Sequence, residues 1–250
     1  MRSRHTAGVL LASPLLLVLL LAFVAPVLLM VPLSLHPYVP GSGIASGWTL
    51  ANYTSILTDE YYREVVLRTL VLGFGVTAIC LVLGYPLAYY IANAGPRMRL
   101  ALTMLVIFPM LLNLVVRSFG WIALLANRGL INNLLIDIGL IERPIRMMFN
   151  LFGLLVGMSH IFLPFMVLML VPAIQAIPKD VQSAAYTLAA SRLRVFWSIT
   201  LPMSAPGILS GSILVFVLTI SALVTPRMLG GATYKVMATL IYDDFLQTLD

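Results

Sequence analysis

The chain has 250 residues, of which 61% are hydrophobic and only 10% are charged, and its formal net charge is +6. Because soluble domains carry about 25% charged residues, this composition excludes an ordinary soluble domain and predicts a membrane protein with several spans. The basic residues stand singly between apolar runs, which excludes a basic surface with interleaved aromatic residues for binding nucleic acid.

The sequence contains no pattern typical of an enzyme. The H-E-x-x-H, G-x-S-x-G and phosphate-loop patterns are missing, and the three histidines, His5, His36 and His160, are far apart. The single cysteine, Cys80, lies in an apolar run and is expected to be a buried free thiol. We therefore expect no catalytic residues, no metal site and no bound cofactor, so any ATP that drives the protein must be bound by a partner.

Long apolar runs predict membrane-spanning helices, each needing about 20 residues to cross the bilayer core. The first run follows Arg2 and Arg4, as in a signal peptide, but it is longer than the roughly 7–15 apolar residues of a signal peptide and lacks a cleavage site. We interpret it as a retained first span. The sequence predicts an all-α transmembrane helical bundle of about five to six spans, forming a single domain over residues 1–250. The predicted spans are residues 9–33, 66–92, 100–124, 148–174 and 207–224, with a sixth starting near residue 236.

A polar segment, residues 178–206, separates the fourth predicted span from the fifth. Asp180 is expected to cap a helix over residues 181–194, because its carboxylate can accept from the free N–H groups of the first helical turn. This stretch is rich in alanine and leucine, which favour helix. Pro202 and Pro206 are expected to end the helical run.

This segment resembles the "EAA" loop of binding-protein-dependent ABC importer permeases. The resemblance rests on residues 183–185 (Ser-Ala-Ala), 189–190 (Ala-Ala) and 199–202 (Ile-x-Leu-Pro). In that family the loop forms a short helix that docks into a cleft of the ATPase subunit. Ser183 stands where glutamate is usual, which removes the carboxylate of a family salt bridge. Ala189 stands where glycine is usual, so no positive φ is expected there. The alternative is an ordinary amphipathic loop helix.

Further short motifs resemble those of the same family, in the same order. They are residues 84–89 (Gly-Tyr-Pro-Leu-Ala-Tyr), residues 129–135 (Gly-Leu-Ile-Asn-Asn-Leu-Leu) and residues 223–231, which are similar to a segment of the polyamine-type permeases. The resemblance implies the fold of a type I ABC importer permease and the transport of spermidine or putrescine. The alternatives are a permease for an opine, an amino-acid-like solute, iron or molybdate, and a polytopic membrane enzyme or scaffold.

The resemblance also implies partners and a location in the cell. The implied partners are two ABC ATPase subunits that bind the ATP, a second homologous permease subunit, an extracytoplasmic substrate-binding protein and a small-molecule substrate. The implied location is the lipid bilayer of the bacterial inner membrane. Lys and Arg mark cytoplasmic loops, but their number is equal on the two sides of the predicted spans. Their density in short segments favours a cytoplasmic N-terminus and a cytoplasmic 178–206 loop.

Two groups of residues are candidates for function. The resemblance assigns coupling to the ATPase to the small side chains of the loop and an aromatic anchor, namely Ser183, Ala184, Ala185, Tyr186, Ala189, Ala190 and Pro202. Ionisable residues at membrane depth and an acidic–aromatic cluster that suits a cation predict a substrate pathway, made of Arg117, His160, Tyr242, Asp243 and Asp244.

The second group has alternatives. Arg117 is expected near the outer mouth of the pathway, or else extends to the membrane interface beside Trp121. His160 either lines the pathway or is a hydrogen-bonded core histidine. The adjacent Asp243 and Asp244 either bind a cation or form a solvated entrance to a span.

Overall fold

The computed structural model describes residues 2–39 and 43–248. It contains two compact units, one of residues 1–63 with 243–250 and one of residues 64–242. Apart from one pair of two-residue strands, the regular elements of the described residues are helices, which confirms the predicted all-α class.

The smaller unit begins with α1 (Arg2–Ser34), an apolar helix that contains Pro14, Pro26 and Pro32. Its candidate span, Ser13–Ser34, has 22 residues and none of it is buried. A helix with this length and composition can cross the hydrocarbon core of a bilayer, where lipid replaces the protein core as its apolar environment.

A short connection follows α1 in the same unit. Strands β1 (Tyr38–Val39) and β2 (Gly43–Ile44) pair antiparallel, and α2 (Ala51–Thr58) comes next. The amide of Asn52 donates to two carbonyls, at the end of α1 and just beyond it, at 2.9 and 3.0 Å. These bonds tie the start of α2 to the end of α1.

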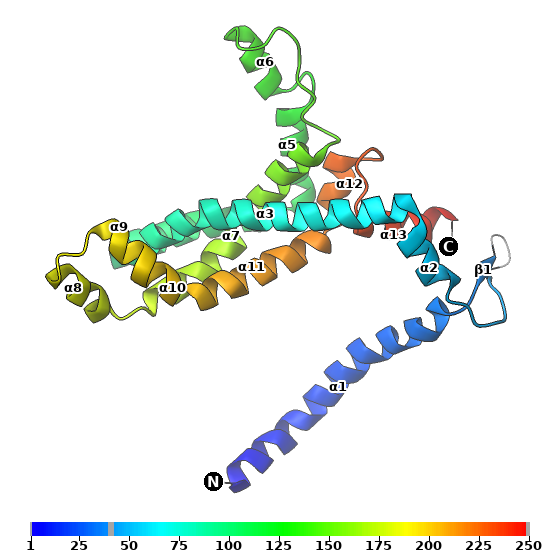
Figure 1. Cartoon of the computed structure of the whole chain (residues 1–250), viewed down its shortest axis with the longest axis horizontal. Coiled ribbons are helices and arrows are strands. Elements are labelled where there is room, and N and C mark those ends of the chain that lie inside the picture. Colours follow the sequence, from blue (N-terminus) through cyan, green and yellow to red (C-terminus); the bar gives the residue numbers. More distant parts are fainter. Residues whose placement is uncertain (1, 40–42, 249–250) are drawn as a thin grey trace. The chain divides into compact units, whose positions relative to one another are not determined.

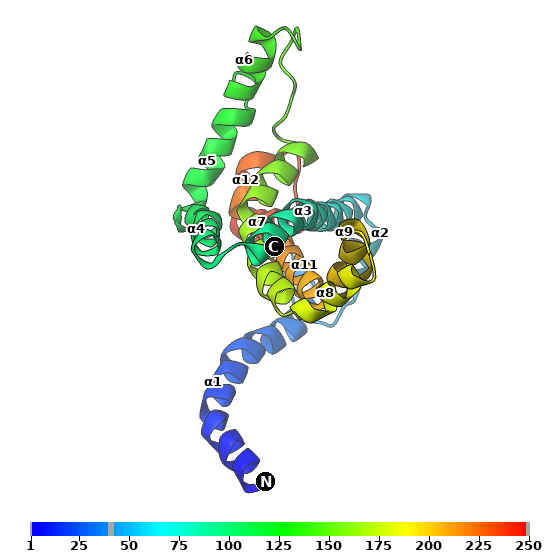
Figure 2. The same cartoon turned by 90° about the vertical axis from the view of Figure 1, so that its left-hand side faces the viewer.

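The larger unit is built on three long helices, α3 (Glu60–Asn93), α7 (Leu151–Gln175) and α11 (Ala205–Ile220). They lie side by side in Figure 1 and again when the view is turned in Figure 2. Fully buried side chains such as Leu72 on α3 and Met166 on α7 belong to their common core. The three helices therefore form the frame on which the other elements of this unit are placed.

Two glycines one turn apart bring α11 close to α7. A Cβ at Gly207 would lie 2.2 Å from the Cβ of Ala173, and a Cβ at Gly211 would lie 2.9 Å from the sulfur of Met166. In membranes, where apolar burial does not favour helix association, such small residues allow the close packing that holds helices together.

The predicted span 100–124 is divided in the structure. It consists of α4 (Pro96–Ile107), the 3₁₀ turn η1 (Phe108–Leu111) and α5 (Leu114–Leu125). The turn contains a proline, which cannot donate a helical hydrogen bond. Asn113 then begins a new helix, because its side chain accepts from the N–H two residues later at 2.8 Å.

Helix α6 (Leu130–Asp137) follows α5 and protrudes from the bundle with its connecting loop (Figure 1). Asn132 is fully buried in this protrusion. Its amide donates to the carbonyls of Ala126 and Ile145, both at 3.0 Å, and its oxygen accepts from the N–H of Ile145 at 2.8 Å. One side chain thus holds the loop after α6 against the chain that precedes it.

Four helices of the described residues are long and apolar enough to cross a membrane, and a fifth span arises if one bent pair is counted. The sequence predicts five to six spans, and the structure reaches five only when the bent pair is counted; its third member lies at Leu114–Asp137. These spans are Ser13–Ser34, Glu60–Asn93, Leu114–Asp137, Leu151–Gln175 and the pair Arg192–Met203 with Ala205–Ile220, bent by 62°.

The C-terminal segment consists of short helices. They are α12 (Val224–Gly230), α13 (Met237–Asp243) and the π-helical turn η3 (Asp244–Thr248). The sixth span predicted to start near residue 236 is represented among the described residues by the seven-residue α13 and by η3.

Residues on α3 hold the loop between α12 and α13. Arg68 donates to the carbonyl of Thr233 at 3.4 Å, pairs with Glu64 at 2.5 Å and lies 4.9 Å over the ring of Tyr234. Thr69 accepts from the N–H of the first residue of α13 at 2.8 Å. Burial raises the pKa of Tyr234, although the nearby Arg68 cation acts to lower it.

Candidate functional site

The predicted coupling segment lies at one end of the bundle. It contains α8 (Lys179–Thr187), α9 (Arg192–Val195), the π-helical turn η2 (Phe196–Thr200) and α10 (Leu201–Met203). Figure 1 shows α8 and α9 at this end, with α12 and α13 at the other. Helices α7 and α11 lead into and out of the segment, so any displacement of it acts on these two helices directly.

The helix predicted over residues 181–194 is shorter in the structure and starts earlier. Pro178 precedes its first residue, and Asp180 lies in the first turn without capping it. Since Pro178 fixes the extended backbone at the N-cap, the carboxylate of Asp180 is left to favour the positive end of the helix dipole instead. The helix ends at Thr187, and a new helix begins at Arg192.

The end of α8 is a Schellman motif closed by an alanine. The N–H of Ala190 donates to the carbonyl of Ala185 at 3.1 Å, and the N–H of Ala189 donates to the carbonyl of Tyr186 at 3.0 Å. This pair of bonds requires a left-handed residue after the helix, and Ala189 has φ 55°. The expectation that position 189 needs no positive φ is therefore wrong. The glycine that the family usually has here would adopt this conformation without strain.

The coupling candidates differ in their accessibility. Ser183, Ala184 and Ala189 are exposed, while Ala185 and Ala190, which are joined by a backbone hydrogen bond of the Schellman motif, are half-buried. Large apolar side chains surround the small ones: Tyr186 is 44% exposed, Leu188 84%, Leu193 72% and Trp197 63%. An exposed apolar surface of this kind, on short helices at the end of a bundle, is typical of a protein–protein contact.

Pro202 does not end the helical run, contrary to expectation. Directly before it, the π-helical turn η2 ends with a bond from the N–H of Leu201 to the carbonyl of Phe196, an adjustment that accommodates prolines in membrane helices. The run Arg192–Met203 instead stops at Ser204, where the chain bends by 62° into α11. The buried Ser204 hydroxyl is 2.8 Å from the hydroxyl of Tyr85, which ties the bend to α3.

The structure brings together two of the five pathway candidates, Arg117 and His160. The Nη2 of Arg117 donates to the backbone carbonyl of His160 at 3.2 Å. Trp121 donates from Nε1 to Nδ1 of the same histidine, also at 3.2 Å, with their rings edge to face and centroids 5.4 Å apart. Because Nδ1 accepts, this imidazole is neutral and carries its proton on Nε2.

The placement of Arg117 and His160 in the substrate pathway stays a prediction. His160 is the tenth residue of α7, so the contact lies about 14 Å along that helix, within the candidate span Leu151–Gln175. The His160 side chain is exposed on the surface of the bundle and is not a core histidine. Arg117 is half-buried, and its Nε has no hydrogen-bond partner among the described residues.

The other three pathway candidates lie at the C-terminal end of the chain. The guanidinium of Arg227 lies 4.3 Å from the centroid of the Tyr242 ring, so a cation of the chain itself already covers that ring. Asp243 ends α13 and Asp244 begins η3, and both are half-buried. No hydrogen bond or ring contact joins Tyr242 to Arg117 or His160 in the described residues.

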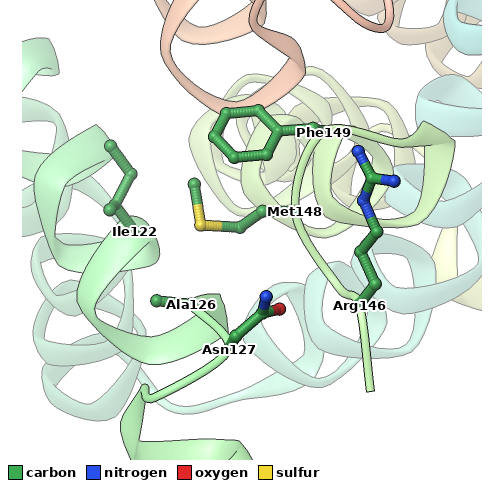
Figure 3. A pocket seen from close by; sticks show the side chains of 6 residues that line it. All are labelled: Ile122, Ala126, Asn127, Arg146, Met148 and Phe149. Carbon is green, nitrogen blue, oxygen red and sulfur yellow. The ribbon is translucent and has the colours of Figure 1, made fainter. Parts of the chain in front are cut away.

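A pocket of about 280 Å³ that no sequence motif indicated opens between the end of α5 and the start of α7. It is lined by Ile122, Ala126, Asn127, Arg146, Met148 and Phe149, and Figure 3 shows the ring of Phe149 and the guanidinium of Arg146 at its edge. Phe149 has φ 60°, and its N–H donates to the carbonyl of Leu229 at 2.8 Å. The lining residues come from segments about 20 apart in sequence, so only the fold joins them.

The remaining sequence expectations concern single groups. Cys80 is fully buried, as predicted, and its thiol donates to the carbonyl of Ser159 at 3.5 Å. Within the part of the chain that the structure describes, no three His, Cys, Asp or Glu side chains are grouped so that they could hold a metal ion.

Comparison with known proteins relates the chain to membrane transport proteins. Residues 81–248 match the family model of the binding-protein-dependent transport system inner membrane component. The chain is 36% identical over 203 residues to the spermidine/putrescine transport system permease protein PotB of Escherichia coli K12, covering 81% of this chain and 74% of that protein. It is 32% identical over 198 residues to PotB of Haemophilus influenzae, covering 79% and 69%.

A more distant relative and a solved structure are also similar to this chain. The molybdenum transport system permease protein ModB of Mycobacterium bovis is 26% identical over 195 residues, covering 78% of this chain and 72% of that protein. A chain of the bacterial alginate ABC transporter, solved in complex with an alginate pentasaccharide-bound periplasmic protein, superposes with a TM-score of 0.71 at 19% identity. That match covers 99% of this chain and 86% of the other.

Proposed function

Because this chain belongs to the family of binding-protein-dependent transport system inner membrane components, we propose that it forms the pathway by which a polyamine, spermidine or putrescine, crosses the bacterial inner membrane. The chain is a permease subunit of an ABC importer. The polyamine proposal rests on the 36% identity to the spermidine/putrescine permease PotB. Residues 223–231, which resemble the polyamine-type permeases, add to it.

The partners of the chain follow from its place in such an importer. Two ATPase subunits bind and hydrolyse the ATP, a second homologous permease completes the pathway, and an extracytoplasmic binding protein delivers the substrate. The N-terminus and the 178–206 loop face the cytoplasm. The support for the ATPase contact is the exposed apolar surface around Leu188, Leu193 and Trp197, on short helices that lie at the end of the bundle.

The coupling mechanism uses α8 as the contact with the ATPase. The exposed Ser183 and Ala184 allow close approach of a groove, and the neighbouring Tyr186 supplies an aromatic anchor. Closure of the ATPases on ATP displaces α8, and the displacement tilts α7 and α11, which carry the segment at its two ends. The pathway then alternates between openings to the outside and to the cytoplasm.

This contact is tested by adding a charge to α8. Ala184→Glu should uncouple ATP hydrolysis from uptake, because a bulky carboxylate cannot enter a groove shaped for alanine. Ala185 is unsuitable for this purpose, since it is half-buried and its substitution would disturb the Schellman motif as well. The measurement is substrate uptake per ATP hydrolysed in vesicles containing the whole importer, with Ala184→Ser as the matched control. Wild-type coupling in Ala184→Glu would exclude docking through this face.

The substrate is tested in the assembled importer. Vesicles that contain this chain, its second permease and the ATPases are supplied with the cognate binding protein and labelled spermidine or putrescine. Uptake should require ATP and should be abolished by a hydrolysis-deficient ATPase. A binding protein that binds neither polyamine would overturn the substrate proposal.

A permease for an anionic solute is the second candidate. One observation favours it: Arg117 places a cation inside the span, and no described carboxylate pairs with it. A cation at this depth would repel a polyamine and attract an anion. The relative ModB, named for molybdenum transport, is consistent with this class. Uptake of labelled molybdate by the same vesicles, in the absence of polyamine uptake, would decide for it.

A further inference from the structure

A proline interrupts the backbone bonding of α7 within the membrane. Pro164 is buried in the middle of this helix, and its nitrogen carries no hydrogen to donate to the carbonyl four residues earlier, which is that of His160. Inside a bilayer an unsatisfied backbone carbonyl costs several kcal/mol. The fold must therefore provide another donor for this carbonyl or leave it without a partner.

The donor comes from the side chain of Arg117 on α5. Its Nη2 lies 3.2 Å from the carbonyl oxygen of His160, the one that Pro164 leaves free. A bond from a charged donor to a carbonyl is stronger than one between neutral groups. It is also the only hydrogen bond that the Arg117 side chain makes among the described residues, since its Nε has no partner.

Helix α5 is held at this place by two further polar contacts. Trp121, one turn after Arg117, donates to the ring of the same histidine at 3.2 Å. On a neighbouring face, the buried hydroxyls of Ser118 and Thr225 lie 3.2 Å apart and join α5 to α12. These bonds join α5 to α7 and α12, and they hold the Arg117 guanidinium beside the carbonyl of His160.

We propose that Arg117 is a positioning residue that replaces the backbone donor missing at Pro164 and thereby stabilises α7 at this proline. In this role it acts on α7 rather than on the substrate. The functional part of this proposal rests on the coupling function proposed above, because α7 leads into the coupling segment and a displacement transmitted along α7 must pass Pro164. The structural part, a bond that compensates for a proline, holds for any substrate.

A double-mutant cycle separates this role from substrate binding. Arg117→Met removes the donor but keeps a long side chain, and Pro164→Ala returns an N–H to the backbone. In the otherwise unchanged protein, which has Pro164, Arg117→Met should accelerate irreversible thermal inactivation of the purified importer about three- to tenfold. In the Pro164→Ala background the same change should have an effect of less than about twofold, because the carbonyl of His160 then has its helical donor.

Pro172→Ala is the matched control. It restores an N–H on the same helix, but to the carbonyl of Leu168 rather than to that of His160, so it should not relieve the loss caused by Arg117→Met. Should Pro164→Ala fail to reach the membrane, Pro164→Ser restores the same N–H. Equal losses from Arg117→Met in the Pro164, Pro164→Ala and Pro172→Ala backgrounds would overturn the proposal.

Transport measurements on the same variants provide a readout that a purely stabilising residue would not move. Arg117→Met should lower the uptake per ATP hydrolysed and leave the half-saturating substrate concentration unchanged, and Pro164→Ala should restore the uptake ratio. A raised half-saturating concentration that Pro164→Ala does not correct would place Arg117 in the substrate site and refute the proposal. The thermal cycle needs no substrate, so a failure of the polyamine assignment would not be confused with a failure of this inference.

Discussion

The alanine at position 189 makes a prediction about the stability of the coupling loop. It has φ 55° at the end of α8, a conformation that costs an L-residue with a side chain about 1–2 kcal/mol. Replacement by glycine removes that cost, while the greater freedom of glycine in the open state returns about 0.4–1 kcal/mol. The net effect of Ala189→Gly should be stabilisation of the closed loop by about 0.5–1 kcal/mol.

The measurement is hydrogen exchange of the backbone amides at positions 189 and 190, whose hydrogen bonds close the Schellman motif. A gain of this size slows exchange through local opening by about two- to fivefold. Ala184→Gly is the matched control, because the same substitution inside α8 should weaken the helix by about 1 kcal/mol and speed exchange. If both glycine variants changed exchange in the same direction, a left-handed strain at position 189 could not be the cause.

Two further predictions test the packing of the larger unit. Gly207→Ala should lower the melting temperature of the importer, since its Cβ would lie 2.2 Å from that of Ala173, whereas Gly120→Ala on α5, where the added Cβ meets no atom within 4 Å, should leave it unchanged or raise it. Asn132→Ala should cost about 2–3 kcal/mol locally, because it leaves the N–H and the carbonyl of Ile145 without their partners, while the carbonyl of Ala126 keeps the N–H of Gly129. Limited proteolysis checks this, with faster cleavage after α6 expected and an unchanged cleavage pattern counting against the bonding.

The sequence was sufficient to predict the long helices and insufficient to predict their ends and breaks. The apolar runs at 66–92 and 148–174 became α3 and α7 within a few residues, because a span is defined by length and hydropathy alone. The run at 100–124 was divided, because the proline in η1 and the cap at Asn113 act locally and are hidden in an apolar stretch.

In the candidate site, too, single residues could be selected from the sequence, but the contact between them could not be predicted. Arg117 and His160 could each be selected from the sequence, since ionisable residues are rare at membrane depth. Their contact could not, because 43 residues separate them and only the packing of α5 on α7 brings them together. At Ala189 the residue type was misleading, because the hydrogen bonds that close the Schellman motif impose a conformation that alanine disfavours.

The 62° angle at Ser204 has a mechanical consequence. The run Arg192–Met203 contains 12 residues and is about 18 Å long. Its end at Ser204 is hydrogen-bonded to Tyr85 on α3, which makes this end the pivot. Pivoting this arm by about ten degrees would therefore sweep its free tip through about 3 Å, a stroke comparable to the rise of two helical residues.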